Sequence, residues 1–272
     1  MRFYATSSKY ARYATCVTTL LTAAISLSGA ERNFSYVQES AVLAPGQKEL
    51  ELWTTLQGGR ADQDFQRLDS RLELEVGVAP DTQIAMYLNH RRTSENGVAE
   101  SEFEGVSLEL KRRLSDPVAD AMGSAIYVEG TVNGSETELE LKGITDWRAG
   151  SWIIAANAIV EFEWAQTPNA AGDGATTEDE QQLGLTLAAA RSLGEGWSAG
   201  FEIDNRNPIE EGEWESSTLW AGPVVHVANP HLWATLTVMP QLTNLGGEAE
   251  TGTRELGDHS RIEARLLLGT HF

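Results

Sequence analysis

Apolar and charged residues alternate one by one along much of this chain. Within residues 67–78, Leu72 and Leu74 take alternate positions, and Glu73 and Glu75 take the positions beside them. Successive side chains of a β-strand point to opposite faces, so the alternation gives a strand one apolar and one charged face. A helix, which repeats about every 3.6 residues, collects neither set on one face. The pattern therefore restricts the chain to β-structure in which one face of each strand meets an apolar environment.

Segments with this pattern follow one another from Lys48 to the C-terminus, separated by turn-forming residues. Their number and length predict an all-β fold, an up-and-down antiparallel transmembrane β-barrel of about twelve strands. Glycines and small residues blur the alternation between residues 123 and 146. We predict strands at 48–57, 66–79, 82–92, 102–114, 123–133, 136–146, 151–164, 181–192, 197–207, 216–227, 232–242 and 259–272.

The connections between these segments alternate in length. Tight turns such as Ala79-Pro80-Asp81 follow every second strand, and the other connections are longer and polar, as at 93–101, 165–180 and 243–258. The short link at Gly134-Ser135 breaks this rule once. Outer-membrane barrels have short periplasmic turns and long outer loops, so the pattern predicts that both chain termini are periplasmic.

A soluble β-sandwich or lipocalin-like barrel would use the same alternation with the apolar face turned inward. Three features favour the membrane barrel, whose apolar face meets lipid. They are the number of strands, their heavily charged polar faces and the regular alternation of short and long connections. Aromatic residues near segment ends are typical of the girdles at membrane interfaces. These residues are Trp53, Phe103, Trp147, Trp152, Trp164, Trp197, Trp220 and Trp233.

The first thirty residues have the features of a secretory signal peptide. Arg2, Lys9 and Arg12 precede an apolar stretch at 14–28, and Ser28-Gly29-Ala30 is a small-residue cleavage site. A membrane anchor is the alternative, but the apolar stretch is shorter than the ~20 residues that a spanning helix needs. We therefore predict three parts: a signal peptide at 1–30, a periplasmic arm or a plug of the lumen at 31–47, and the barrel at 48–272.

If the apolar face meets lipid, the charged face lines the lumen. Two interpretations remain open: the charges pair across strands and fill a narrow lumen, or they line a water-filled channel that mildly prefers cations. Pairing of the last strand with the first would bring Arg261 and Arg265 near Glu49 or Glu51. The predicted lumen-lining residues are Arg67, Asp69, Arg71, Glu73, Glu75, Arg91, Glu109, Lys111, Arg113, Glu129, Glu138, Glu140, Lys142, Glu161, Glu163, Glu202, Asp204, Arg206, Arg261, Glu263 and Arg265.

The charge and the motifs exclude several functions. A formal net charge of −20 argues against binding to nucleic acid, whose phosphates need Lys and Arg. The single cysteine, Cys16, lies in the predicted leader, so the mature chain has no disulfide, thiolate metal site or cysteine nucleophile. The acidic run at 210–215 is interpreted as a solvated loop, and we predict no metal and no cofactor. No P-loop, HExxH or GxGxxG motif occurs.

An outer-membrane lipid hydrolase is the alternative enzyme hypothesis. It would pair a histidine, His90 or His259, with Ser94 or Ser260 as nucleophile at the barrel rim. Neighbours in a strand point to opposite faces, so His259 and Ser260 are poorly placed to meet. We therefore expect no enzyme activity.

Several short segments carry a family resemblance. They are FSYVQE at 34–39, LAPGQKELE at 43–51, VGVAPDTQI at 76–84 and WAGP at 220–223. Together they resemble an uncharacterised family of Gram-negative outer-membrane β-barrels, similar to the transporter-like family linked by name to meta-pathway phenol degradation. The resemblance implies an outer-membrane location and passive transport, and it carries over no catalytic residue and no substrate.

The function predicted from the sequence is therefore a passive outer-membrane channel for small solutes of unknown identity. A closed barrel with a structural or interaction role is the second hypothesis, and the lipid hydrolase is the third. The expected partners are outer-membrane lipid and the outer-membrane assembly machinery. The terminal strand ends at Phe272 and resembles the signal that this machinery recognises.

Overall fold

The computed structural model describes residues 32–61, 63–168 and 175–272. Its regular elements there are all strands. They are β1 (Lys48–Arg60), β2 (Gln63–Ala79), β3 (Thr82–Glu95), β4 (Val98–Ser115), β5 (Gly123–Asn133), β6 (Glu136–Ala149), β7 (Trp152–Pro168), β8 (Ala175–Gly194), β9 (Trp197–Glu210), β10 (Glu213–Trp214), β11 (Thr218–Ala228), β12 (Leu232–Asn244) and β13 (Ile262–His271). Within the described ranges, no helix is long and apolar enough to cross a membrane.

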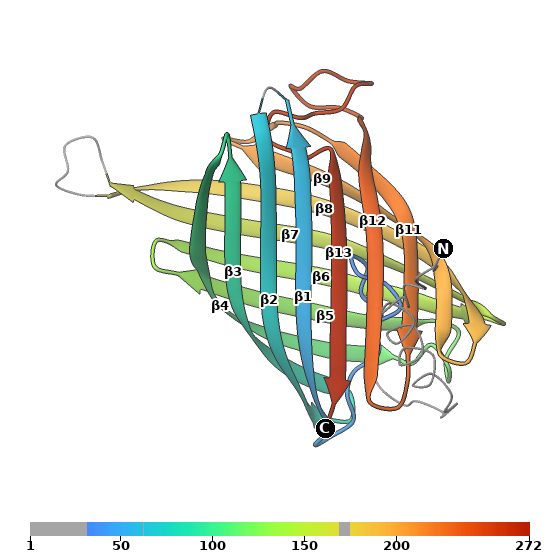
Figure 1. Cartoon of the computed structure of the whole chain (residues 1–272). Coiled ribbons are helices and arrows are strands. Elements are labelled where there is room, and N and C mark those ends of the chain that lie inside the picture. The colour runs from blue at the N-terminus through green and yellow to red at the C-terminus, as the bar shows by residue number, and fades with distance from the viewer. Residues whose placement is uncertain (1–31, 62, 169–174) are drawn as a thin grey trace, which may run out of the picture.

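The strands form one closed antiparallel sheet (Figure 1). From β1 to β9 each strand pairs with the next along the chain, β9 pairs with β11, β11 with β12 and β12 with β13, and β13 pairs with β1 to close the barrel. The two-residue β10 pairs with β9 alone in a small extension of that strand, so twelve long strands make the barrel. The predicted fold, an all-β up-and-down barrel of about twelve strands, is confirmed.

The apolar face of each strand points outward. Leu72 keeps 43% of its surface exposed, whereas its neighbour Glu73 is 0% exposed. Leu268 on the last strand is 42% exposed, and Glu263 on the same strand is buried. This arrangement is the reverse of a soluble barrel, whose apolar side chains fill the interior. A broad belt of exposed leucine, isoleucine and valine therefore surrounds a charged interior.

The strands extend further than the alternation predicted. The polar segment 93–101 is not a long loop, because β3 and β4 continue to a two-residue turn at Asn96 and Gly97. Both turn residues have positive φ, 49° and 84°, as a type I′ hairpin turn requires. Much of 165–180 likewise belongs to β7 and β8, whose hairpin projects beyond the other strands (Figure 1). Backbone pairing needs no apolar face, so it continues where the alternation stops.

The register at the barrel seam differs from the expectation. Pairing of β13 with β1 sets Arg265 opposite Thr55 and His271 opposite Glu49. Arg265 Nε donates to Thr55 Oγ1 at 2.9 Å. Arg261 precedes β13 and is exposed. The prediction that Arg261 and Arg265 lie near Glu49 or Glu51 is therefore wrong, because Gly269 and His271 are the residues opposite Glu51 and Glu49.

Three of the predicted girdle aromatics point inward instead. Trp53, Trp220 and Trp233 are buried inside the barrel, because each occupies an inward position of its strand. Their indole N–H groups donate to inward-facing acceptors, Glu51, Thr218 and Glu49 respectively, as buried tryptophans require. The remaining aromatics of the predicted girdle are exposed: Phe103, Trp147, Trp152, Trp164 and Trp197.

The segment before β1 runs through the barrel interior. Figure 1 shows its blue trace between the walls, at the end where β1 begins and β13 finishes. Phe34 and Val37 are fully buried and pack on small apolar side chains that face inward from β7, β8 and β11. Gly46 donates to the carbonyl of Gly77 at 2.8 Å, and Gly77 donates to the carbonyl of Gln47 at 3.0 Å, which joins the segment to the wall where β1 begins.

Candidate functional site in the barrel interior

The interior segment, residues 32–47, is held by polar side chains from the barrel wall. Glu202 on β9 accepts the backbone N–H groups of Tyr36 at 2.8 Å and Val37 at 3.0 Å, and the Ser35 hydroxyl at 3.2 Å. Thr237 donates to the same carboxylate from β12. One buried carboxylate thereby satisfies several donors of a segment that has no secondary structure of its own.

Amide side chains on other strands bind the rest of this segment. Asn157 on β7 accepts the N–H of Gln38 at 2.7 Å and donates to the carbonyl of the same residue at 2.9 Å. Gln83 on β3 accepts the N–H of Leu43 at 3.0 Å. These contacts imitate the pairing that a neighbouring strand would provide. They provide buried partners for backbone groups of an irregular segment, which has no helix or sheet pairing of its own.

Two glycines leave room for the interior segment. A Cβ atom added to Gly123 would lie 2.2 Å from Ser40 Oγ and 2.5 Å from Asp146 Oδ1. A Cβ on Gly77 would lie 2.2 Å from the carbonyl oxygen of Ala44. Both distances are below contact distance, so any larger residue would displace the segment or the wall. The wall and the segment are therefore shaped to each other.

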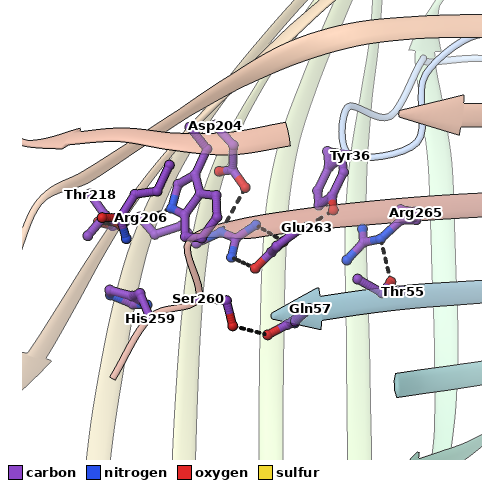
Figure 2. Close-up of polar contacts among 12 residues, drawn as sticks. Tyr36, Thr55, Gln57, Asp204, Arg206, Thr218, His259, Ser260, Glu263 and Arg265 are labelled. Atoms are coloured by element: carbon purple, nitrogen blue, oxygen red, sulfur yellow. Dashed lines mark hydrogen bonds and ion pairs between the residues drawn. The ribbon is translucent and has the colours of Figure 1, made fainter. Parts of the chain in front are cut away.

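Ionised side chains form a network around Tyr36 of this segment (Figure 2). The Arg206 guanidinium binds both oxygens of Glu263, at 2.8 and 2.9 Å, and donates through Nε to Asp204 at 2.8 Å. The Tyr36 hydroxyl donates to Glu263 at 3.1 Å, and the Arg265 guanidinium lies 4.0 Å from the centre of the Tyr36 ring. Arg206 and Glu263 are thus paired in the bidentate geometry that favours a fixed orientation.

Towards the opposite end the lumen is partly open. A cavity of about 230 Å³ lies between β2, β3, β4, β5, β6 and β7. Its charged lining has more acids than bases: Asp69, Glu104, Glu129, Glu136, Glu138 and Glu163 against Arg71 and Arg91. Ion pairs cross this wall, with Arg91 binding Asp69 at 2.8 Å and Glu104 at 3.0 Å. Charges therefore pair across strands while space still remains beside them, and the water-filled channel stays a prediction.

A group of buried carboxylates lines the wall on β1, β2 and β4. Glu49, Glu51 and Glu75 bring one oxygen each within 4.8 Å of the others, and so do Glu73, Glu75 and Glu109. All five side chains are buried. Arg32, from the interior segment, stacks on Trp53 beside this group, 4.2 Å from the ring centre.

The structure brings most of the predicted lumen residues onto the inward side of their strands. Arg261 differs, because it is exposed ahead of β13. Arg113 lies on the same side of β4 as Glu109 and Lys111, near the end of the strand, where it pairs with Asp116 in the following turn at 3.3 Å. The other inward residues are Arg67, Asp69, Arg71, Glu73, Glu75, Arg91, Glu109, Lys111, Glu129, Glu138, Glu140, Lys142, Glu161, Glu163, Glu202, Asp204, Arg206, Glu263 and Arg265.

Several interior residues were missing from the predicted set. Glu49 and Glu51 alternate with Leu50 and Leu52, so the same pattern could have placed them in the lumen. Uncharged polar residues such as Asn157 carry no charge signal beside alanine and isoleucine neighbours. Their role depends on the interior segment, which no local pattern connects to them.

The serine–histidine pairs of the hydrolase hypothesis do not form. Ser94 and His90 are four residues apart on one strand, roughly 13 Å. Ser260 Oγ donates to Gln57 at 3.5 Å. His259 Nε2 instead lies 3.3 Å from Ser216 Oγ and 4.0 Å from Glu255 Oε2. A catalytic triad needs the serine and the acid on different ring nitrogens, so this group lacks that geometry.

Comparison with known proteins places the chain in a family. Residues 26–138 and 151–272 match DUF6662, a family of unknown function. The chain belongs to this family. The link to meta-pathway phenol degradation stays a prediction. No curated protein matches the chain by sequence.

Solved structures with a similar fold are outer-membrane barrels. The COG4313 outer membrane channel from Pseudomonas putida F1 is 11% identical with a TM-score of 0.58, covering 86% of this chain and 98% of that chain. The translocator domain of the autotransporter NalP from Neisseria meningitidis is 11% identical with a TM-score of 0.55, covering 83% and 88%. The NanC porin is 9% identical with a TM-score of 0.50, covering 81% and 98%. At such identities the likeness concerns the fold.

Proposed function

We propose that this protein is an outer-membrane channel for small polar solutes, with both termini in the periplasm and residues 32–47 as a plug that restricts passage. The exposed apolar belt supports the membrane location, since a soluble barrel would not leave so many large apolar side chains in water. The fold shared with a channel and a porin supports conduction. Export through a cleaved leader ending at Ala30 would deliver the chain, although residues 1–31 lie outside the described ranges.

The observation that carries the proposal is the division of the lumen into two parts. One end holds the interior segment, and the other holds the cavity of about 230 Å³ with its charged lining. A barrel whose only purpose is structural has no need of an internal space lined by charges. The excess of acids over bases in that space favours cations over anions, as charged rings do in other pores.

The plug is attached in a way that allows it to move. Its described polar contacts to the wall are hydrogen bonds and one ion pair, Arg148 with Glu39 at 2.7 Å. Each such hydrogen bond contributes only about 0.5–1.5 kcal/mol, or roughly twice that when one partner is charged. The segment continues directly into β1, so it remains tethered when these contacts break.

Planar bilayer recording of the folded chain starting at residue 31 tests this function. A variant that lacks residues 32–43 should show larger and longer conductance steps, with a reversal potential in a salt gradient that indicates cation preference. Pro45→Ala is the matched control, because Pro45 is exposed and its side chain touches no lumen group that we describe. Both proteins must show heat-modifiable migration on gels, which reports a folded barrel.

Each contrary outcome has a separate meaning. If both the full chain and the shortened variant are silent, the barrel is closed and has a structural or interaction role. If both conduct equally, the channel stands and the plug is rejected. Recovery of the protein in the soluble periplasm without detergent would reject the membrane location altogether.

A further inference from the structure

The buried carboxylates on β1, β2 and β4 form one continuous site. Glu75 belongs to both oxygen triads, the one with Glu49 and Glu51 and the one with Glu73 and Glu109. A cation beside Glu75 could therefore draw ligands from either side. The neighbouring strands keep these side chains in place, because β1 pairs with β2 so that Glu49 is opposite Glu75 and Glu51 is opposite Glu73.

Several oxygens of this group lack a hydrogen-bond donor among the described residues. Both oxygens of Glu73 are buried without a donor, and so are one oxygen of Glu51 and one of Glu75. The carboxylates of Glu75 and Glu109 instead each bring an oxygen within 4.8 Å of a Glu73 oxygen. A buried carboxylate normally accepts several hydrogen bonds, since leaving it unsatisfied is costly. These oxygens therefore indicate a missing positive partner.

The positive side chains nearby form no described ion pair with Glu51, Glu73 or Glu75. Lys111 lies near Glu109, and His271 Nδ1 lies 3.3 Å from Glu49. Arg32 lies near Glu51, Glu73 and Glu75, but its guanidinium stacks on Trp53 and forms none of the ion pairs described for this interior. Arg71, on the same strand as Glu73, is bound to Glu129 instead. Several like charges this close in a buried place repel strongly unless a cation offsets them.

We propose that Glu51, Glu73 and Glu75, with Glu49 and Glu109 beside them, bind a divalent cation of the Ca²⁺ type. The ligands are carboxylate oxygens, which hard cations prefer, and the mature chain contains no cysteine for a softer metal. Ca²⁺ accepts many protein oxygens in flexible geometry, whereas Mg²⁺ keeps several waters. The bound ion would join β1, β2 and β4 on the inside of the barrel. This inference does not depend on whether the channel conducts.

Luminescence of Tb³⁺, a Ca²⁺ substitute, tests the site directly. Trp53 Nε1 donates to Glu51 at 2.8 Å and Trp233 donates to Glu49, so excited indoles lie next to the ligands and should sensitise bound Tb³⁺. The folded chain in detergent is stripped with chelator, titrated with Tb³⁺, and then competed with Ca²⁺ and Mg²⁺. We expect saturable emission that Ca²⁺ reverses more effectively than Mg²⁺.

Substitutions identify the ligands. Glu75→Gln and Glu73→Gln should each weaken Tb³⁺ and Ca²⁺ binding about tenfold or more, because even indirect partners of metal ligands contribute that much. Glu161→Gln is the matched control, since it removes one inward carboxylate of β7 away from the group, and its binding should equal that of the unaltered chain.

Thermal unfolding supplies a second measurement on the unaltered chain. Ca²⁺ should raise the midpoint relative to chelator, and Glu75→Gln should abolish that shift. Glu51→Gln replaces either variant that does not fold. Absence of sensitised emission, failure of Ca²⁺ to compete, or equal affinity in Glu75→Gln and Glu161→Gln would overturn the proposal. In that case protons, not a metal ion, offset the charges.

Discussion

The carboxylate of Glu202 accepts the backbone N–H of Tyr36 at 2.8 Å, across 166 residues of sequence. The same carboxylate accepts hydrogen bonds from the Val37 N–H and the Ser35 hydroxyl, so one side chain on β9 holds three consecutive residues of the interior segment. Substitution of Glu202 is therefore a direct test of how the proposed plug is held in the barrel.

Glu202→Ala should loosen the segment without opening the barrel. It removes hydrogen bonds to a charged group, each worth about 1.5–3 kcal/mol. In a chain that starts at residue 31, a Val37→Cys reporter is the single cysteine and is buried in the parent; it should react with a water-soluble maleimide at least tenfold faster in this variant. Glu210→Ala, an exposed residue of the same strand, should leave the labelling rate unchanged. Equal rates in both variants would contradict the assignment.

Gly123→Val should displace the segment by steric overlap with the added side chain, without removing any hydrogen bond that holds the segment. The added side chain would lie where Ser40 and Asp146 are now, whereas Gly143 has no atom within 4 Å of its added Cβ. Gly143→Val is therefore the control. We expect faster labelling of the Val37→Cys reporter and larger conductance for Gly123→Val alone, together with retained heat-modifiable migration. Normal labelling in this variant would show that the close approach is not important.

The acids of the open cavity should set ion preference. In the variant lacking residues 32–43, Glu138→Gln combined with Glu163→Gln should lower the permeability ratio of K⁺ over Cl⁻, and Arg91→Gln should raise it. Both changes alter the charge of the same cavity in opposite directions. Reversal potentials in a KCl gradient measure the ratio. Shifts of the same sign in the two variants would reject a cavity that selects by charge.

Arg32→Gln should strengthen cation binding at the carboxylate group. The guanidinium lies near Glu51, Glu73 and Glu75 and competes electrostatically with any bound ion. We expect a several-fold lower dissociation constant for Tb³⁺ and Ca²⁺, measured by the same luminescence titration. Arg148→Gln, which removes a different contact of the segment, controls for loosening of the segment itself. Weaker binding in Arg32→Gln would argue that Arg32 organises the site.

Acidification should open the long connection between β12 and β13. Burial and the nearby Arg206 charge hold the pKa of His259 below its ordinary value of 6.5, against the opposing effect of Glu255. The unfolded loop therefore binds the proton more readily, and the stability that neutral His259 contributes is lost as pH falls below about 6.5. Ser216 and Trp220 face the ring from β11 and its approach.

Hydrogen exchange of residues 245–261 at pH 7.5 and pH 5 measures this effect. Protection should fall at the lower pH in the parent chain and change little in His259→Gln, which cannot gain the charge. An unchanged protection pattern in the parent would contradict the prediction.

Local alternation was sufficient to predict the barrel and most of its lining, because the polarity of residues such as Leu72 and Glu73 indicates which face of the strand points outward and which points inward. The prediction failed where the polarity of a residue does not indicate its face. Trp53 and Trp233 are largely apolar, yet each occupies an inward position of its strand, where its N–H donates to a carboxylate. The seam between β1 and β13 joins the two ends of the barrel sequence, and no neighbouring residues specify its register.

The interior segment was left undecided by the sequence for a related reason. Residues such as Gln38 and Leu43 have no periodicity, and their partners Asn157 and Gln83 lie far away along the chain. A glycine at position 123 is equally uninformative by itself, because a glycine within a strand has many causes. Only the three-dimensional arrangement shows which of these residues act together.

The interior segment also constrains the order of assembly. Its partners Gln83, Asp146, Asn157, Glu202 and Thr235 come from widely spaced strands, so its docking site exists only once the wall around it is complete. Residues 32–47 therefore reach their final position only after these strands have paired. Contacts this distant in sequence form slowly, which leaves a period in which a nascent barrel is closed but still hollow.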